Sequence, residues 1–419
     1  MARSIYTLAI LALLPWALLH LLWRARRQPQ YLRHWRERFG FYGSAAAVPT
    51  IWIHAVSVGE TRAAQPLVAA LRARYPGHRI VISHMTPTGR QTSADLFGAA
   101  VERCYLPYDT PWAARSFLRH YAPCIGLIVE TELWPNLIAA GRAAGMPLLL
   151  VNARLSERSA RRYGRFPQLS GDALRSLSAI SAIGRDDAQR LEDLGAAAVA
   201  VSGNLKFDIE PPVEQLRLGV ELRRRCGTRP IFLCASTRVG EEAPILAAWQ
   251  MAAPPDALLV IVPRHPQRFG EVAQLAADRG FKVERRSTDG DVAAQTQVWI
   301  GDSMGEMFGY YAAADVAFVG GSLGDYGSQN LIEPCAVGTP VLIGPSTFNF
   351  PDAARAALSC GAAQAIGSAE ELVRAAASLL ADGERRRDMS ARAKVFAAAH
   401  RGATARTLEL VERFIPAGR

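Results

Sequence analysis

Three glutamates follow two apolar runs in the first half of the chain, in positions that suit acid–base chemistry. The first, Glu60, closes the run Ile51-Trp-Ile-His-Ala-Val-Ser-Val-Gly-Glu60, in which Gly59 permits a tight turn from a strand into a helix. A carboxylate at the end of a strand can act as a general base toward a hydroxyl nucleophile. A glutamate at a helix start also complements the helix dipole, so the residues alone leave both roles open.

The other two, Glu130 and Glu132, lie in the segment Glu130-Thr-Glu-Leu-Trp-Pro135, after an apolar run. Burying unpaired carboxylates is costly, so two of them at a strand end need cationic neighbours or a substrate. Alternatively, one of them caps the helix that Pro135 begins. Five cationic or titratable side chains on neighbouring loops could pair with these acids or face an anionic acceptor: His54, His84, Arg90, Arg154 and Arg158.

A lysine follows the last apolar run of the first half, in Gly203-Asn-Leu-Lys206-Phe-Asp208. Lys206 could offset the charge of a departing phosphate. A single lysine is more often a solvated surface residue, and the sequence leaves that alternative open.

Two segments of the second half suit phosphate binding. Val260-Ile-Val-Pro263-Arg264-His265-Pro266 ends a strand in a cationic loop; Arg264 suits a bidentate phosphate contact, and the prolines restrict the loop. Ser303-Met-Gly-Glu306 fits a capping box at the start of a helix, although the amides of that turn could also hold a phosphate or a base.

The segment richest in glycine is Gly320-Gly-Ser-Leu-Gly-Asp-Tyr-Gly-Ser-Gln-Asn330-Leu-Ile-Glu333. Glycines let the backbone approach an anion closely, and a helix N-terminus attracts it. Glu333 could accept both hydroxyls of a ribose. A plain loop would not need four glycines and an asparagine so close together, so this segment predicts ligand binding.

The elements that must position these residues are short apolar runs that alternate with helical patterns, as in parallel sheets with helical crossovers. Predicted strands of the first half are 50–56, 79–83, 126–130, 147–152, 179–183 and 197–201. Those of the second half are 230–235, 257–262, 281–284, 297–300, 315–319 and 340–343. Predicted helices include 67–75, 137–144, 187–194 and a long stretch from about residue 368.

This alternation predicts an α/β protein of two doubly wound domains facing a cleft, with ligands at the carboxyl ends of the strands. Pro211-Pro212 marks the linker. No strand is followed by G-x-G-x-x-G with a suitable downstream acid, so a nicotinamide cofactor has no support, and no Walker A pattern is present. The six cysteines show no CxxC spacing and suit a reduced core.

The N-terminus predicts membrane attachment. The segment 4–23 carries no charge, and as a helix it would rise about 30 Å, enough to cross the hydrocarbon core. Six arginines lie within residues 24–38 and one precedes the segment, which predicts that everything after residue 24 is cytoplasmic. A tightly bound surface helix is the alternative to a spanning anchor. The net charge of +10 favours an anionic partner.

Eight segments, in this order and across nearly the whole chain, resemble the 3-deoxy-D-manno-octulosonic acid (Kdo) transferases of Gram-negative lipopolysaccharide synthesis. They are His54-Ala-Val-Ser-Val-Gly-Glu60, Glu130-Thr-Glu-Leu-Trp-Pro135, Asn152-Ala-Arg-Leu-Ser156, Gly203-Asn-Leu-Lys-Phe-Asp208, Pro263-Arg-His-Pro266, Gly301-Asp-Ser-Met-Gly-Glu306, Asn330-Leu-Ile-Glu333 and Pro345-Ser-Thr-Phe-Asn-Phe350. Many relatives have Gly-Gly-His-Asn where this chain has Gly327-Ser-Gln-Asn330, and histidine at Ser346.

The resemblance implies a GT-B fold of two Rossmann-like domains and an inverting transfer of Kdo from CMP-Kdo to the anionic lipid A precursor (lipid IVA), with Glu60 as the base. Glu130 and Lys206 would stabilise the transition state. The CMP contacts implied are Pro263, Arg264, Met304, Gly305, Glu306, Asn330, Leu331, Ile332 and Glu333.

It further implies an inner-membrane protein whose catalytic domains are cytoplasmic, without a metal, cofactor or nucleic-acid partner. The expected division is an anchor at 1–24, an acceptor-binding domain at 25–208, a linker at 209–216 and a CMP-sugar-binding domain at 217–419. Two alternatives remain: a GT-B lipid glycosyltransferase that uses a UDP-sugar, and a non-catalytic membrane-associated lipid-binding protein.

Overall fold

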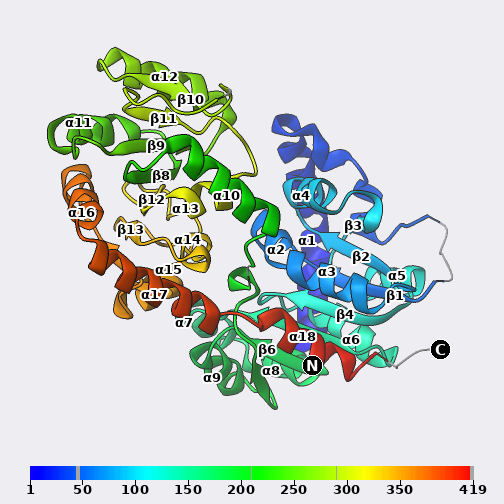
Figure 1. Ribbon diagram of the computed structural model, residues 1–419. Helices are drawn as coiled ribbons and strands as arrows, with labels where there is room; N and C mark the ends of the chain where they lie inside the picture. Colours follow the sequence, from blue (N-terminus) through cyan, green and yellow to red (C-terminus); the bar gives the residue numbers. More distant parts are fainter. Residues whose placement is uncertain (44–47, 209, 289, 416–419) are drawn as a thin grey trace. The chain divides into compact units, whose positions relative to one another are not determined.

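The computed structural model describes all residues except 44–47, 209, 289 and 416–419, and it divides into two compact units (Figure 1). Unit 1 comprises Met1–Asp208 together with the C-terminal segment from Arg401, and unit 2 comprises the residues between them. Each unit is an α/β body built on a seven-stranded sheet whose paired strands are all parallel.

The sheet of unit 1 has the order β3-β2-β1-β4-β5-β6-β7. Its strands are β1 (Thr50–His54), β2 (Arg79–His84), β3 (Glu102–Tyr105), β4 (Pro123–Val129), β5 (Leu148–Ala153), β6 (Ala179–Ala182) and β7 (Val199–Val201). All but β3 were predicted. The edge strand β3 was missed because it begins with charged residues and only its last two residues are buried.

The strand order of unit 1 reverses between β1 and β4. From β1 the chain builds outward through β2 and β3, and it then returns to pair β4 with the other side of β1. The loops after β1 and β4 therefore diverge at the carboxyl edge of the sheet, where ligands bind in doubly wound folds. Glu60 follows the first of these strands and Glu130 follows the second.

Helices cover both faces of this sheet: α1 (Ala2–Arg27), α2 (Val58–Ala63), α3 (Gln65–Arg74), α4 (Pro87–Phe97), α5 (Pro111–Tyr121), α6 (Pro135–Ala143), α7 (Glu157–Tyr163), α8 (Pro167–Arg175), α9 (Arg185–Asp193) and α18 (Ala403–Glu412). Side chains of β1 alternate between the two cores: Trp52 packs in one and Ile51 and Ile53 in the other. Several helices begin with proline, which favours the first turn.

The C-terminal helix corrects the expected division of the chain. The alanine- and arginine-rich stretch forms three helices, and the last of them, α18, packs on α3 of unit 1 instead of joining unit 2. Ala403 and Val411 of α18 are fully buried in the same core as Leu67 and Leu71 of α3. The expected C-terminal domain of 217–419 is therefore wrong for the residues after His400.

The sheet of unit 2 has the order β10-β11-β9-β8-β12-β13-β14. Its strands are β8 (Ile231–Thr237), β9 (Leu258–Pro263), β10 (Val283–Arg285), β11 (Val298–Ile300), β12 (Val316–Val319), β13 (Val341–Ile343) and β14 (Ala363–Ala365). Only the three-residue edge strand β14 was not predicted. The order reverses between β8 and β12, so the loops after these two strands form the corresponding crevice of this unit.

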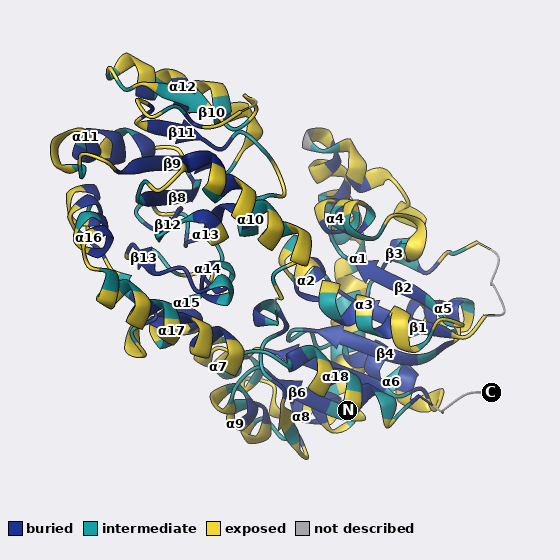
Figure 2. Ribbon diagram, in the orientation of Figure 1, coloured by how far each residue is buried: buried dark blue, intermediate teal, exposed yellow. Residues whose placement is uncertain are grey.

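The helices of unit 2 are α10 (Val213–Cys226), α11 (Glu242–Ala252), α12 (Phe269–Asp278), α13 (Met307–Ala313), α14 (Ile332–Val337), α15 (Pro351–Ser359), α16 (Ala369–Ala381) and α17 (Gly383–Ala399). Helix α10 starts at Val213, so the predicted linker 209–216 is partly helical. The central strands are buried along their length, as Figure 2 shows, and Trp249 stacks on Phe232 in the core with 5.6 Å between ring centroids.

Candidate functional site

Glu60 lies in the first turn of α2, directly after β1. The Ser57 hydroxyl donates to Oε1 of Glu60 at 2.9 Å, and the backbone N–H of Val56 donates to Oε2. Burial, and then the negative charge of Glu130, raise the pKa of Glu60 against these hydrogen bonds. Glu60 is thus a helix-start residue and also a partly desolvated carboxylate, which is a stronger base once deprotonated.

Glu130 and Lys206 form an ion pair at the end of β4. The Lys206 Nζ atom lies 2.7 Å from Oε1 of Glu130, although the two residues are 76 positions apart. Glu130 has a φ of 63°, in the left-handed region, which costs a non-glycine residue on the order of 1 kcal/mol. Lys206 is therefore held beside the predicted acids and is not the solvated surface lysine that the sequence also allowed.

Glu132 completes a group of three carboxylates at this edge. Burial raises the pKa of Glu132 to about 7, with further contributions from the negative charges of Glu60 and Glu130. The suggestion that Glu130 or Glu132 caps α6 is wrong, because Asp109 accepts the amides of Asn136 and Leu137 that open the helix. The three acids therefore concentrate negative charge beside Lys206.

The expectation that nearby histidines face these acids or an anionic acceptor is wrong. His54 and His84, the last residues of β1 and β2, are fully buried, and their Nδ1 atoms are hydrogen-bonded to the Ser83 hydroxyl and to the carbonyl of Ala55, respectively. Burial lowers the pKa of His54 to about 3 and that of His84 to about 4, so both are neutral at physiological pH. Arg90 pairs with Glu37 at 2.9 Å, and Arg154 and Arg158 lie exposed at the surface.

In unit 2, the structure joins two of the three predicted nucleotide-binding segments. Arg264, in the loop after β9, donates from Nε to Oε1 of Gln329 in the glycine-rich loop at 3.3 Å. The next residue, Asn330, donates to Oε1 of Glu333 at 3.3 Å and accepts the N–H of Ile332 at 3.0 Å. Leu331 and Ile332 are fully buried, so neither residue offers exposed surface to a ligand in this structure.

The third predicted segment, Met304 to Glu306, follows β11, which pairs with β9, so it lies at the same edge of the sheet as Pro263. The capping box predicted there is wrong, because α13 begins only at Met307. The Ser303 hydroxyl donates instead to Oε2 of Glu306 at 2.6 Å. Gly305 has a φ of 80°, which this turn requires.

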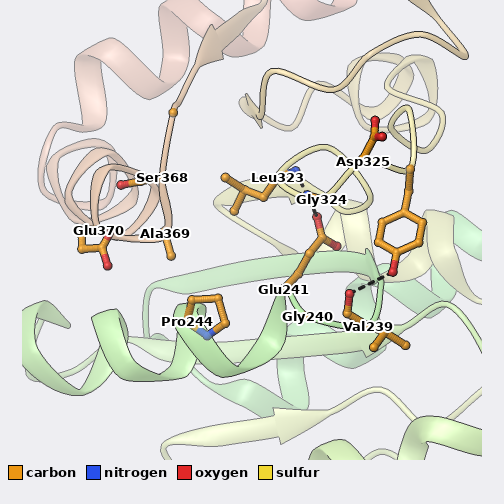
Figure 3. Close-up of a pocket in the computed structure, with 12 residues that line it drawn as sticks. Val239, Gly240, Glu241, Pro244, Leu323, Gly324, Asp325, Ser368, Ala369 and Glu370 are labelled. Carbon is orange, nitrogen blue, oxygen red and sulfur yellow. Dashed lines mark hydrogen bonds between the residues drawn. The ribbon is translucent and has the colours of Figure 1, made fainter.

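Glu241, which the sequence reasoning missed, organises the glycine-rich loop. Its side chain is almost fully buried, and its carboxylate accepts the N–H group of Gly321 at 2.7 Å. It also accepts those of Leu323 at 3.1 Å and Gly324 at 3.4 Å, in the part of the loop drawn in Figure 3. The expectation that the glycine-rich backbone binds a ligand anion is therefore wrong for these three amides, which bind the protein's own carboxylate. The signal available was the acidic pair after the strand ending at Thr237.

Arg238, also missed, adds positive charge at the same edge. Its Nη1 atom lies 2.8 Å from Nε2 of His265, and its guanidinium stacks over Tyr326 at 4.6 Å from the ring centroid. It thereby links the loops after β8, β9 and β12. Together with Arg264, it gives this edge of unit 2 two arginines.

A pocket of about 640 Å³ lies between the glycine-rich loop and the starts of α11 and α16 (Figure 3). None of the predicted CMP-binding residues lines it, whereas the carboxylates of Glu241, Asp325 and Glu370 do. Such an acidic lining does not suit a phosphate. Among the described residues, no three His, Cys, Asp or Glu side chains are grouped so that they could hold a metal ion.

Known protein families match both units of the chain. Residues 33–209 match the family described as 3-deoxy-D-manno-octulosonic-acid transferase (kdotransferase), and residues 255–396 match glycosyl transferases group 1. The fold is similar to that of UDP-GlcNAc 2-epimerase from Neisseria meningitidis, with a TM-score of 0.57 and 15% identity over 87% of this chain and 100% of that one. The two parallel sheets form a GT-B-like glycosyltransferase fold.

Relatives over the full length are closer. The chain is 46% identical to the 3-deoxy-D-manno-octulosonic acid transferase of Bordetella pertussis, covering 99% of this chain and 100% of the relative. It is 38% identical to that of Haemophilus influenzae, covering 99% of each. This chain therefore belongs to the 3-deoxy-D-manno-octulosonic acid transferase family.

Proposed function

We propose that this protein transfers Kdo from CMP-Kdo to lipid IVA, the phosphorylated lipid A precursor, with inversion at the sugar carbon. Membership in the Kdo transferase family supports the sugar. The observation that carries the mechanism is the position of three side chains in unit 1. Glu60 and Glu130 lie on the two loops at the reversal of strand order, and Lys206, from the 3-10 helix after β7, is bonded to Glu130.

Glu60 is the proposed general base. It accepts the proton of an acceptor hydroxyl, and the hydroxyl oxygen attacks the anomeric carbon of Kdo as the bond from that carbon to the CMP phosphate oxygen breaks. CMP leaves with the bonding electrons, and the configuration inverts because attack and departure occur on opposite faces. The raised pKa of Glu60 supports this role, because a more basic carboxylate takes the proton more readily.

Lys206 is proposed to stabilise the negative charge that develops on the departing phosphate, and Glu130 is proposed to hold the lysine in place. The ion pair supports this assignment, since it fixes an ammonium group among three carboxylates that would otherwise repel an anionic substrate.

Unit 2 is proposed to hold the donor. Arg264 would contact the single phosphate of CMP, and Glu333, oriented by Asn330, would accept the ribose hydroxyls. Pro263 and the turn from Met304 to Glu306 would complete the CMP contacts.

The protein is proposed to act at the inner membrane, with both units in the cytoplasm. Helix α1 is long and apolar enough to cross a bilayer, with a mean hydropathy of 2.1 in its most apolar window. The arginines that follow it support the cytoplasmic side for the body.

The donor and the acceptor are tested together with the purified protein in detergent. Incubation with CMP-Kdo and lipid IVA should release CMP and raise the mass of the lipid by one or more Kdo units. Matched reactions contain a UDP-sugar in place of CMP-Kdo, or lack the lipid. Release of UDP, with no CMP release, would support the alternative of a UDP-sugar transferase and contradict the proposal.

A further inference from the structure

The first turns of α1 make polar contacts with the body of unit 1. The Tyr6 hydroxyl donates to Oδ2 of Asp109 at 3.0 Å, and the Thr7 hydroxyl donates to Oδ1 of Asn136 at 3.0 Å. Asp109 and Asn136 are buried and bonded to each other, since Asp109 Oδ2 accepts the Asn136 N–H at 3.0 Å. Two polar side chains in an apolar helix thus meet a polar network inside the folded body.

The contact continues along the helix. Partly or fully buried residues recur every three or four positions, which places them on one face: Tyr6, Ile10, Leu14, Ala17, Leu21 and Ala25. Helix α1 contacts α6 and α8, and at its C-terminal end Leu21 and Ala25 pack with Tyr31. In Figure 1 the helix runs behind the sheet of unit 1. One face of α1 is therefore a packing surface.

Both flanks of α1 reach the same loop of the body. Near the start of the helix, Tyr6 bonds to Asp109. Beyond its C-terminal end, the carbonyl of Arg38 accepts the N–H of Tyr108 at 2.8 Å. The stretch from Tyr6 to Trp23 rises about 25 Å as a helix. A helix that crossed the hydrocarbon core, about 30 Å thick, would carry Tyr6 to the side opposite Asp109. The observed contacts and a membrane-spanning α1 exclude each other.

The opposite face of α1 is apolar and exposed. Its large exposed side chains are Ile5, Leu8, Leu11, Leu13, Trp16, Leu18, Leu19, Leu22 and Trp23. Exposed arginines follow at positions 24, 26, 33 and 36. An apolar face beside cationic side chains fits the boundary between the headgroups and the acyl chains of an anionic leaflet.

A groove of about 1010 Å³ beside α1 has the same character. It lies between α1, α5 and α6, with Arg3, Arg115 and Arg119 close to Leu8 and Trp112. Basic and apolar side chains therefore lie together at the N-terminal end of α1 as well. Both ends of the helix match one leaflet, whereas a spanning helix would need its two ends at opposite surfaces.

We propose that α1 lies along the cytoplasmic leaflet of an anionic membrane, with one face on unit 1 and the other in the lipid, and does not cross the bilayer. This rests on the membrane attachment proposed above and changes its geometry. The protein is held at the membrane through one leaflet, and Met1 stays on the same side of the bilayer as the catalytic body.

Cross-linking in native membranes tests the packing. Thr7→Cys with Asn136→Cys, in a Cys360→Ser background, should be joined within one chain by a short bis-maleimide. The control pair is Leu19→Cys with Asn136→Cys, since Leu19 is 65% exposed and lies about 18 Å further along the helix. Failure of the first pair to cross-link, in variants that retain wild-type thermal unfolding, would overturn the proposal. Cross-links between two chains at Leu19→Cys would assign the exposed face to a second copy and also overturn it.

Sided labelling gives a second test that needs no close pair. Ser4 is exposed, and the native Cys360, exposed in unit 2, reports the side of the body. In sealed vesicles, a membrane-impermeant maleimide should label Ser4→Cys only from the side that labels Cys360. Labelling of Ser4→Cys from the opposite side would show a spanning helix and overturn the proposal.

Vesicle binding separates this proposal from the attachment on which it rests. The protein should sediment with vesicles that contain phosphatidylglycerol, and far less with pure phosphatidylcholine. Failure to sediment with either would contradict membrane attachment itself, whereas opposite-side labelling would contradict only the orientation of α1. Neither result depends on the transfer reaction, which is measured in detergent.

Discussion

The Nζ atom of Lys206 lies 2.7 Å from Oε1 of Glu130, and the two side chains are 28% and 25% exposed. Glu130 directly follows β4, and Lys206 lies in the short 3-10 helix Leu205–Phe207 beyond β7, so only the folded sheet brings them together. Beside them, Glu60 and Glu132 carry further negative charge. Lys206 thus brings a positive charge next to these carboxylates.

Lys206→Met should lower kcat by about 10- to 1000-fold, because the leaving phosphate loses the cation proposed to stabilise it. Glu130→Gln should also lower kcat, and the double variant should be far less impaired than the product of the two single effects, since the residues act as a pair. Steady-state kinetics with CMP-Kdo and lipid IVA measure this. Lys282→Met, at an exposed site in unit 2, is the control. Independent effects of the two substitutions would contradict the pairing.

Glu241→Gln should raise the KM for CMP-Kdo by about 10- to 100-fold, because a neutral amide cannot satisfy the backbone N–H groups that the buried carboxylate accepts. Glu241 is a positioning residue, so kcat at saturating donor should fall much less. Glu370→Gln, at an exposed acid on the same pocket, is the matched control. A lowered kcat with an unchanged KM would show that Glu241 does not act through the donor loop.

Ser328→Gly should give a more stable protein than Ser328→Ala, by about 1 kcal/mol in the free energy of unfolding. Ser328 has a φ of 70°, a left-handed conformation that glycine adopts without strain. Both substitutions remove the hydroxyl, so the comparison isolates the contribution of backbone strain to the free energy of unfolding. Thermal or denaturant unfolding measures it, and equal stability of the two variants would exclude strain at Ser328.

The positions of most strands were predictable, because buried parallel strands are nearly continuous apolar runs. Glu60, Glu130 and Arg264 were singled out as candidates because ligand-binding residues follow such strands. The short edge strands β3 and β14 lack that signal. The role of Glu241 depends on contacts with residues about 80 positions away, which no local pattern encodes.

A local pattern also misled at one place. Ser303-Met-Gly-Glu306 has the spacing of a capping box, but the left-handed Gly305 turns the chain before α13 begins. The apolar segment at the N-terminus forms the predicted long helix, but the partners of Tyr6 and Thr7 are visible only in the folded unit. Spacing predicts which contacts are possible, and packing decides which ones form.

The catalytic role of Glu60 is tested most directly by Glu60→Gln, assayed for Kdo transfer and for CMP-Kdo binding. Glutamine keeps the size of the side chain but cannot accept the acceptor's proton, so kcat should fall by at least about 100-fold. Because Glu60 lies in unit 1, CMP-Kdo should bind with unchanged affinity. Glu157→Gln, at an exposed glutamate in the first turn of α7, should leave both properties unchanged. Transfer by Glu60→Gln at the wild-type rate would contradict the general-base mechanism.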